Sequence, residues 1–526
     1  MKTHSTMSRR DFMKALGFGT AGVGAAAVAM GPIRDLDELL SASPSTSTAT
    51  QKKPWWVKER KYLDPPVKID WDMMKRYDRT FGAQPARGQT RYYTREQIAG
   101  FTKEGQDFWA NNYANGGRPG YDIRWRALQA GKSSGESSSQ WTGHLGLSEA
   151  AKNSTPNAGQ FSSVPYAPWS GTPEEASALL TAAMRYYGAL WVGYQTLDDK
   201  WRNKLLVKCT TAMPAGDWPD VGDVAEDDKN YYLYDDNATE PSRRSSTTGV
   251  GNSYVIPTKK EQSIIVFATG VSMELMKAMW TTTSTPNSTI PTNFHDAIAI
   301  RTAKFIRALT GDICYGDMGH QTASTNFSAA TVFSGIAENA RQNLFSMTPE
   351  VGPALNPTNI HTSLKLAPTN PIDAGMWKFC QTCGKCAETC PSESIPKSNI
   401  KASYDIPEIK RVDGVTEKQV FHNPGYEGLW ANSESCYMYR SLRVGSGTSA
   451  CSVCYGNCTF TEDKAAMIHN MVRATITMTP LFNGFFAKLS DPFGFGQYEN
   501  PDVWWKMALP SNGWDSTIGT NKGAYR

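Results

Sequence analysis

Apolar residues recur at helical and strand-like spacing through the middle of this 526-residue chain. Thr172, Pro173 and Glu175 form a helix start with an N-cap, a first-turn proline and a capping-box glutamate. Gly188 lies where such a helix stops. The continuous apolar run 264–268 is typical of a buried strand. We therefore predict a helix between Thr172 and Gly188 and a buried core strand over 264–268.

Two more helices are expected beyond that strand. The first covers residues 273–280, and the second begins with Asn293 as its N-cap and ends near Gly311. The second helix has apolar positions at helical spacing, namely Ile298, Phe305, Ile306 and Leu309. A loop carrying Cys314 and Tyr315 is expected to follow.

The flanking regions have less regular patterns. Residues from about 55 to 159 are rich in Gly, Ser, Asn and aromatics, which indicates loops and short helices around a core. Residues 465–475 indicate a helix, and the aromatic tail with Trp504 and Trp505 is too apolar to extend into water. Helices and a buried strand ahead of a turn-rich cysteine region favour an α+β or α/β fold.

Eight of the ten cysteines carry the strongest chemical signal. Cys380, Cys383, Cys386 and Cys390-Pro391 have the spacing of a bacterial ferredoxin loop, in which three thiolates bind one 4Fe-4S cluster and the fourth binds another. A second group follows with a stretched first spacing and Thr459 in place of proline: Cys436, Cys451, Cys454 and Cys458. The crossed ligation of two-cluster ferredoxins pairs Cys458 with the first three cysteines and Cys390 with Cys436, Cys451 and Cys454.

Other uses of these cysteines stay open. Structural disulfides persist in an oxidising compartment, and two zinc ions could also use eight thiolates. A run of four cysteines ending in Cys-Pro is nevertheless the ferredoxin arrangement rather than the paired CxxC of a zinc ribbon. Cys209 and Cys314 are most simply small buried apolar residues.

The N-terminus indicates export. Ser8-Arg9-Arg10-Asp11-Phe12-Met13-Lys14 precedes a Gly- and Ala-rich apolar stretch over 15–30, as in a twin-arginine signal. That stretch falls short of the roughly 20 strongly apolar residues of a membrane span. We expect a signal peptide over residues 1–42. Because this route moves folded proteins, clusters could be inserted before export.

Charge and length exclude some partners. The net charge is +4 with 20% charged residues and no long Lys/Arg run, which argues against nucleic-acid binding. The part after the leader has no 20-residue apolar segment, so the exported protein is expected to be soluble or held at a membrane by a separate partner. The length suits one large domain and one smaller one.

The order of leader, large domain and cysteine region resembles the respiratory reductive dehalogenases, which are corrinoid enzymes. Four phrases carry the resemblance, most closely to the subgroup acting on chlorinated ethenes: 9–14, 169–175, 367–375 and Phe482-Asn-Gly-Phe-Phe486. It implies an α+β fold with a nitroreductase-like corrinoid-binding domain over 43–365 and a ferredoxin-like domain with two 4Fe-4S clusters over 366–470. A C-terminal tail over 471–526 would pack back on the body. The corrinoid would be of the cobalamin type, bound base-off.

The resemblance also implies site residues. Tyr315 matches the family's proton-donating tyrosine, and Asn339, in Gly335-Ile-Ala-Glu-Asn-Ala-Arg341, matches an assisting amide. A third, usually basic, family residue falls near Asn359, with His361 close by. This departure leaves the third role open, and His361 is most simply a solvated loop histidine.

The implied reaction removes halogen from a small organohalide at the end of anaerobic organohalide respiration. It implies an external electron donor, a small membrane-anchor protein and a peripheral place on the outer face of the cytoplasmic membrane. One rival is a corrinoid reductase of another substrate, similar to epoxyqueuosine reductase, which the leader disfavours because transfer RNA is cytosolic. Another is a two-cluster electron-transfer subunit, which leaves about 320 residues ahead of the cysteines unexplained.

Overall fold

The computed structural model describes most of the chain between residues 53 and 507. The described residues are 53, 56–81, 90–114, 117–122, 124, 168–211, 229–238, 242–245, 252–257, 263–278, 284–315, 325–343, 345–443, 451–461 and 496–507. The leader, the helix expected over 465–475 and Phe482–Phe486 lie outside them.

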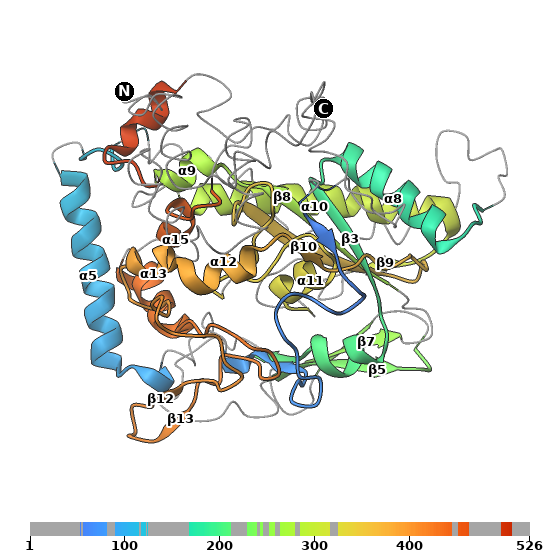
Figure 1. Cartoon of the computed structure of the whole chain (residues 1–526), viewed down its shortest axis with the longest axis horizontal. Coiled ribbons are helices and arrows are strands. Elements are labelled where there is room, and N and C mark those ends of the chain that lie inside the picture. The colour runs from blue at the N-terminus through green and yellow to red at the C-terminus, as the bar shows by residue number, and fades with distance from the viewer. Residues whose placement is uncertain are drawn as a thin grey trace, which may run out of the picture.

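A four-stranded antiparallel sheet forms the centre of the molecule (Figure 1). Its strands, in spatial order, are β3 (Trp191–Thr196), β8 (Ser263–Gly270), β10 (Leu355–Thr362) and the two-residue edge strand β9 (Cys314–Tyr315). Every residue of β8 and of β10 is buried, as expected of strands covered on both faces. The strand predicted over 264–268 is confirmed, whereas the loop predicted at Cys314 and Tyr315 is wrong. These two residues instead pair with β10.

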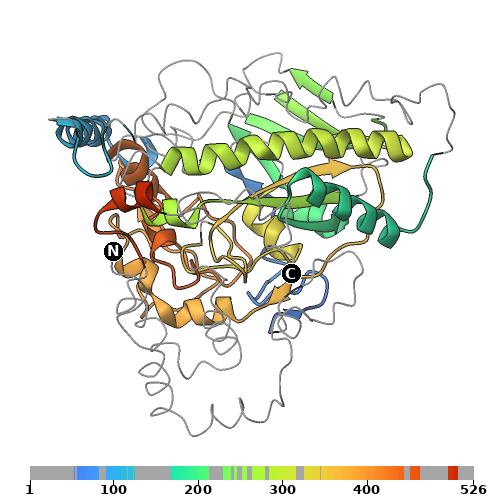
Figure 2. The same cartoon turned by 90° about the horizontal axis from the view of Figure 1, so that it is seen from above.

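Two helices cover one face of this sheet (Figures 1 and 2). They are α8 (Pro173–Tyr187) and α10 (Ser284–Thr310), and their core contacts include Leu180, Met184, Ile298 and Ile306. The opposite face packs against the short helix α11 (Phe327–Phe333) and against the π-helical turn η4 (Trp201–Leu205). The sheet is therefore the middle layer of the core.

The predicted helix starts have different outcomes. Thr172 caps α8 with the expected capping box, and Gly188 ends it at a φ of 113°. The start at Asn293 is wrong, because α10 already begins at Ser284 and continues through Pro291. The Pro291 carbonyl accepts a hydrogen bond from the Thr269 hydroxyl at 3.3 Å, so the helix contacts β8 at its proline. Ser272 caps the shorter helix α9 (Met273–Lys277).

A second, mixed sheet lies beside the first. Its strands, in spatial order, are β2 (Tyr77–Asp78), β4 (Val207–Thr211), β5 (Lys229–Asp235), β7 (Asn252–Pro257) and β6 (Ser242–Ser245). Strand β2 runs parallel to β4 and β5 runs parallel to β7. The 3₁₀ turn η1 (Arg79–Phe81) follows β2 directly.

The sequence patterns missed strand β3 and the whole second sheet, and they also missed helix α5 (Arg95–Tyr113), in a region where we expected only loops and short helices. Thr94 and Gln97 form a capping box at its start, which is a signal that the sequence does contain. The helix packs against η6 (Met438–Arg443) of the cysteine region.

The cysteine region consists of short helices beside the main sheet (Figure 1). These are α12 (Met376–Cys383), α13 (Lys385–Glu388), α14 (Ser433–Tyr437) and α15 (Val453–Gly456). Strand β1 (Lys58–Glu59) pairs with β11 (Ile372–Asp373), and β12 (Glu408–Lys410) pairs with β13 (Thr416–Lys418). The 3₁₀ helix η9 (Pro501–Lys506) packs Trp504 against Leu275 and Ala278 in and beside α9.

Candidate redox and substrate site

A sharp turn places the first cysteine group. Helix α12 carries Cys380 and Cys383, and α13 carries Cys386. Between the helices, Gly384 has a φ of 71°, and a Cβ at this position would lie 2.6 Å from the Ser398 Cβ. Only glycine meets both conditions without strain, so the chain can reverse between two thiols.

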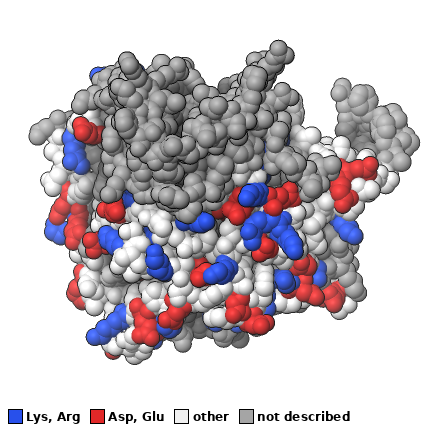
Figure 3. Space-filling view, viewed as in Figure 1, with Lys and Arg blue, Asp and Glu red and all other residues white. Residues whose placement is uncertain are grey.

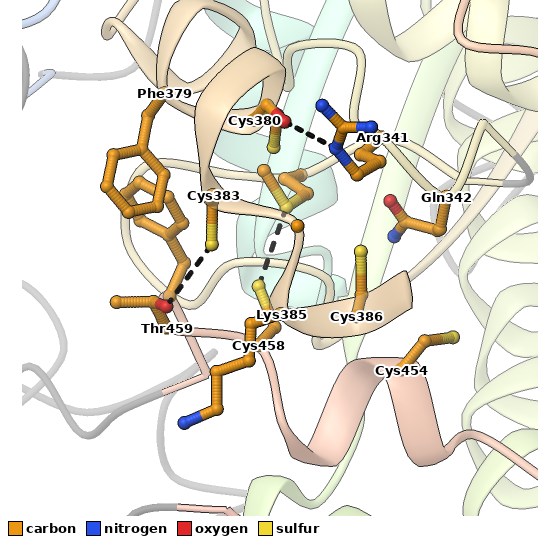
Figure 4. Close-up of a pocket in the computed structure, with 13 residues that line it drawn as sticks. Arg341, Gln342, Phe379, Cys380, Cys383, Lys385, Cys386, Cys454, Cys458 and Thr459 are labelled. Atoms are coloured by element: carbon orange, nitrogen blue, oxygen red, sulfur yellow. Dashed lines mark hydrogen bonds between the residues drawn. The ribbon is translucent and has the colours of Figure 1, made fainter. Parts of the chain in front are cut away.

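Four of the cysteines surround one cavity (Figure 4). Its lining includes Cys380, Cys383, Cys386 and Cys458, and the space between the atoms is about 370 Å³, part of it open to solvent. Cys454 also lines it, so the second cysteine group lies directly beside the first. Phe379, Phe460 and Met347 provide apolar walls. We call the thiols of Cys380, Cys383, Cys386 and Cys458 the first thiol group.

The remaining four cysteines form a second thiol group. The Cys436 thiol interacts electrostatically with Cys390, and the Cys451 thiol interacts with both of them. Cys454 interacts with all three and also with Cys386 of the first group, which in turn interacts with Cys390, so the two groups are adjacent. The two groups are thus assembled across the two sequence runs, which is the arrangement that crossed ligation requires.

The electrostatics of these thiols depend on what they bind. Burial, with smaller contributions from the nearby Cys436 and Cys390, raises the pKa of Cys451 to about 12. Burial, followed by the neighbouring Cys458, also raises the pKa of Cys380. Such thiols become thiolates when a positively charged metal centre binds them. All ten cysteines are free of disulfides. Among the described residues, no three His, Cys, Asp or Glu side chains are grouped as ligands of a single metal ion.

The turn after α11 contacts the first thiol group. The buried Glu338 carboxylate accepts hydrogen bonds from the backbone N–H groups of Ala374 and of Trp377, the latter at 2.9 Å, where α12 begins. The Arg341 guanidinium donates to carbonyls at and beyond the first cysteine. Between them, Asn339 is half-buried. Its side chain makes no hydrogen bond within the part of the chain that the structure describes.

The other expected site residues converge on β10. Tyr315 pairs directly with His361, so the two positions share a face of the sheet, and Asn359 lies on that same face. The side chain of Tyr315 lies outside the described residues. His361 is fully buried in a strand, so the expected solvated loop histidine is wrong.

Asn359 has a side-chain donor with no partner among the described residues. Its Oδ1 accepts a hydrogen bond from the Thr325 hydroxyl, but its buried Nδ2 makes no hydrogen bond to any residue that the structure describes. The side chain is only 1% exposed. An unsatisfied buried amide is unfavourable and uncommon, which marks this face of β10 as a place where a ligand acceptor is expected. The family resemblance pointed to the neighbourhood of Asn359, but it gave the residue no definite role.

The surface adds little to this description. Basic and acidic side chains are interspersed on the face shown in Figure 3, so no single-sign field is visible there. Among the described helices, none has the length and apolar character needed to cross a membrane.

Comparison with known proteins identifies the family. A family model described as "Reductive dehalogenase subunit" matches residues 52–366. The chain is 29% identical to a chloroethene reductive dehalogenase of Dehalococcoides mccartyi strain VS, over 98% of this chain and 99% of that protein. It is 28% identical to a trichloroethene reductive dehalogenase of Dehalococcoides mccartyi strain 195, over 97% and 98%.

A solved reductive dehalogenase structure that suggests a mechanism for B12-dependent dehalogenation has a similar fold. The TM-score is 0.50 at 15% identity, and the match covers 84% of this chain. The chain spans about half of that solved protein, 49% of its length. The family match over more than half of the sequence is decisive, and this chain belongs to the reductive dehalogenase family.

Proposed function

We propose that this chain removes halogen from a short chlorinated aliphatic compound of the chlorinated ethene type, using a base-off corrinoid and two 4Fe-4S clusters. The reaction would be the terminal step of anaerobic organohalide respiration. The observation that carries the proposal is the crossed assembly of eight thiols. The cavity of the first thiol group lies against the turn over residues 335–343, which carries Asn339 and which we call the Asn339 turn. The nearly full-length similarity to chloroethene and trichloroethene reductive dehalogenases supports the substrate class.

The thiols suit the two clusters. Cys380, Cys383, Cys386 and Cys458 would hold one, which we call the inner cluster because Arg341 and Gln342 of the Asn339 turn line its cavity. Cys390, Cys436, Cys451 and Cys454 would hold the other, the outer cluster. The contact of Cys454 with the first cavity supports electron transfer between the two.

The β10 face suits a bound molecule with hydrogen-bond acceptors. The unpartnered Asn359 Nδ2 would donate either to the corrinoid or to the substrate. The chain has no Asp-x-His-x-x-Gly sequence of the kind that supplies a cobalt-ligating histidine, which is compatible with base-off binding. Asn339 and the paired positions of Tyr315 and His361 complete this candidate site.

Each residue has a proposed task in the reaction. When bound, the clusters supply single electrons and the corrinoid supplies the strongly reducing cobalt that breaks the carbon–halogen bond. Tyr315 would donate the proton that replaces the halogen, and because a phenol is a weak acid, the transfer must be assisted at neutral pH. Asn339 would orient the phenol or stabilise its anion. The apolar walls formed by Phe379, Phe460 and Met347 would limit water at the inner cluster.

The cellular setting follows from the leader. Residues 1–42 would direct export by the twin-arginine route, and a small separate membrane-anchor protein would hold the enzyme at the outer face of the cytoplasmic membrane. An external donor would reduce the outer cluster. No nucleic-acid partner is proposed.

Elemental analysis and an assay on the same anaerobic preparation test the proposal. Full-length protein produced with cobalamin should contain about eight iron atoms and about one cobalt per chain and release chloride from trichloroethene when reduced. Iron without cobalt and without chloride release would favour the electron-transfer subunit. Zinc, or metal-free protein with bridged cysteines, would remove the cluster assignment altogether.

A further inference from the structure

Arg341 is a buried cation at the wall of the first thiol cavity (Figure 4). Its side chain is 1% exposed. Its Nε donates to the Cys380 carbonyl at 2.7 Å, and its Nη2 donates to the Gln381 carbonyl at 2.8 Å. Its Nη1 donates to the carbonyls of Pro396 and Lys397, both at 2.9 Å. One guanidinium therefore ties α12 to the segment that follows the first cysteine run.

This cation has no acidic partner among the described residues. All four of its acceptors are neutral backbone carbonyls, and none of its contacts is an ion pair. A buried cation is strongly unfavourable without a compensating negative charge. The nearest acidic groups of the cavity are the thiols, and the Arg341 charge acts on both Cys383 and Cys386. An anionic cluster held by these thiolates would supply the missing counter-charge.

The same turn also holds the other end of α12. Glu338, three residues earlier, accepts the backbone hydrogen bonds at the start of that helix. Ala340 packs in the apolar cluster that contains Cys380, Cys383 and Cys458. Glu338 therefore binds the start of the cysteine-bearing helix α12, and Arg341 binds its C-terminal half. Asn339 lies between these two residues in the sequence. A shift of α12, and of a cluster bound to it, would therefore also shift Asn339.

We propose that Arg341 is a positioning residue. It would offset part of the negative charge of the inner cluster, raise the reduction potential of that cluster and hold it in a fixed position beside the Asn339 turn. This inference rests on the proposed clusters. The second thiol group has a different cation, Arg440, which acts on Cys436 and Cys451 and lies 5.1 Å from the Tyr437 ring. Arg440 is only half-buried, so it provides a matched control of the same residue type.

Redox titration monitored by electron paramagnetic resonance tests the proposal on anaerobic full-length protein. The inner-cluster signal is assigned first, as the one altered by Cys458→Ser. In Arg341→Gln the potential of that cluster should shift downward while the outer-cluster potential stays unchanged. Arg341→Lys keeps the charge but not the forked set of hydrogen bonds, so its shift should be smaller. Arg440→Gln should shift the outer cluster alone.

Each other outcome also decides the proposal. Selective loss of the inner cluster in Arg341→Gln would support the role of Arg341 in holding that cluster. The effect of Arg341 on the reduction potential would then be measured in Arg341→Lys. An unchanged inner-cluster potential in Arg341→Gln overturns the proposal, as does an equal shift of both clusters. Loss of both clusters together also counts against it, since the charge would then serve the whole cysteine region. Wild-type protein lacking two resonance-active clusters would refute the proposed function instead.

Discussion

Asn339 and Asn343 lie in one turn but use their side chains differently. The Asn343 Nδ2 donates to the Tyr426 hydroxyl at 3.1 Å, whereas Asn339 makes no side-chain hydrogen bond within the described chain. Asn339→Ala should therefore change the free energy of unfolding by less than about 0.5 kcal/mol. It should slow dehalogenation about 100-fold, because the amide acts on the reacting groups.

Asn343→Ala is the matched control for that prediction. It removes a hydrogen bond at a residue with a φ of 50°, so it should destabilise the fold by about 1–2 kcal/mol and leave turnover nearly intact. Chemical denaturation and chloride release measure the two effects. If Asn339→Ala turned over substrate at the wild-type rate, Asn339 would have no part in the reaction.

Tyr315 gives the second prediction at the residue scale. Tyr315→Phe removes only the phenolic hydroxyl, so iron and cobalt contents should match wild type. Dehalogenation should fall about 100-fold or more, because no group then delivers the proton. Quantifying chloride at matched cobalt content checks this result. Full activity in the variant would transfer the proton-donor role to another group.

At the scale of elements, Glu338 makes α12 sensitive to pH. Burial raises the pKa of Glu338 from 4.5 to about 8, and the hydrogen bonds from Trp377 and Ala374 offset only part of that shift. Because folding raises this pKa, the associated stability is fully present below about pH 4.5 and is lost as the pH rises through about 8. Glu338→Gln should remove this loss, since a glutamine keeps an acceptor but has no proton to release.

Thermal unfolding of wild type and Glu338→Gln across pH 5 to 9 measures the effect. The variant should gain stability relative to wild type with rising pH, by at most about 1.4 kcal/mol per pH unit. Comparing the two proteins cancels the contribution of Glu434, whose pKa burial also raises to about 8. A stability difference that does not vary with pH would mean that Glu338 keeps one protonation state throughout.

The start of α8 provides a simpler test of an element. The Thr172 hydroxyl accepts a hydrogen bond from the Glu175 backbone N–H at 3.2 Å, so Thr172→Ala should cost about 1 kcal/mol. Ser170→Ala, at a nearby exposed position, should cost almost nothing. Equal unfolding midpoints for the two variants would show that the capping box contributes little.

At the scale of the whole molecule, the crossed thiol groups predict which cluster each cysteine serves. Cys458→Ser should perturb the cluster that is also perturbed by Cys383→Ser, although these residues belong to different runs. Cys390→Ser should instead perturb the same cluster as Cys451→Ser. Iron content and resonance spectra of the four variants check this pattern. Grouping by sequence run would contradict the crossed arrangement.

Local sequence patterns predicted those features that depend on neighbouring residues. The capping box at Thr172 and the core strand over 264–268 are confirmed, because caps and apolar runs act over a few residues. The spacing of Cys380 to Cys390 and the family resemblance likewise needed only the order of residues along the chain. The same reasoning failed at Asn293, because the helix already begins at Ser284 and its Pro291 contacts Thr269 of β8, a segment distant in the sequence.

Only the tertiary structure showed which residues from distant parts of the sequence lie in contact. Three features depend on contacts between distant segments. They are the burial of the Asn359 donor, the pairing of His361 with Tyr315 in a sheet, and the hydrogen bonds of Glu338 and Arg341 to α12. None of them has a sequence signature, since hydrogen bonds and burial depend on three-dimensional proximity rather than on spacing. The sequence by itself therefore determined the chemistry that this chain carries, namely eight thiols and the residues of a dehalogenase. The tertiary structure decided how that chemistry is positioned. The turn after α11 packs against α12, and the hydrogen bonds of Glu338 and Arg341 hold the cysteine-bearing helix beside Asn339.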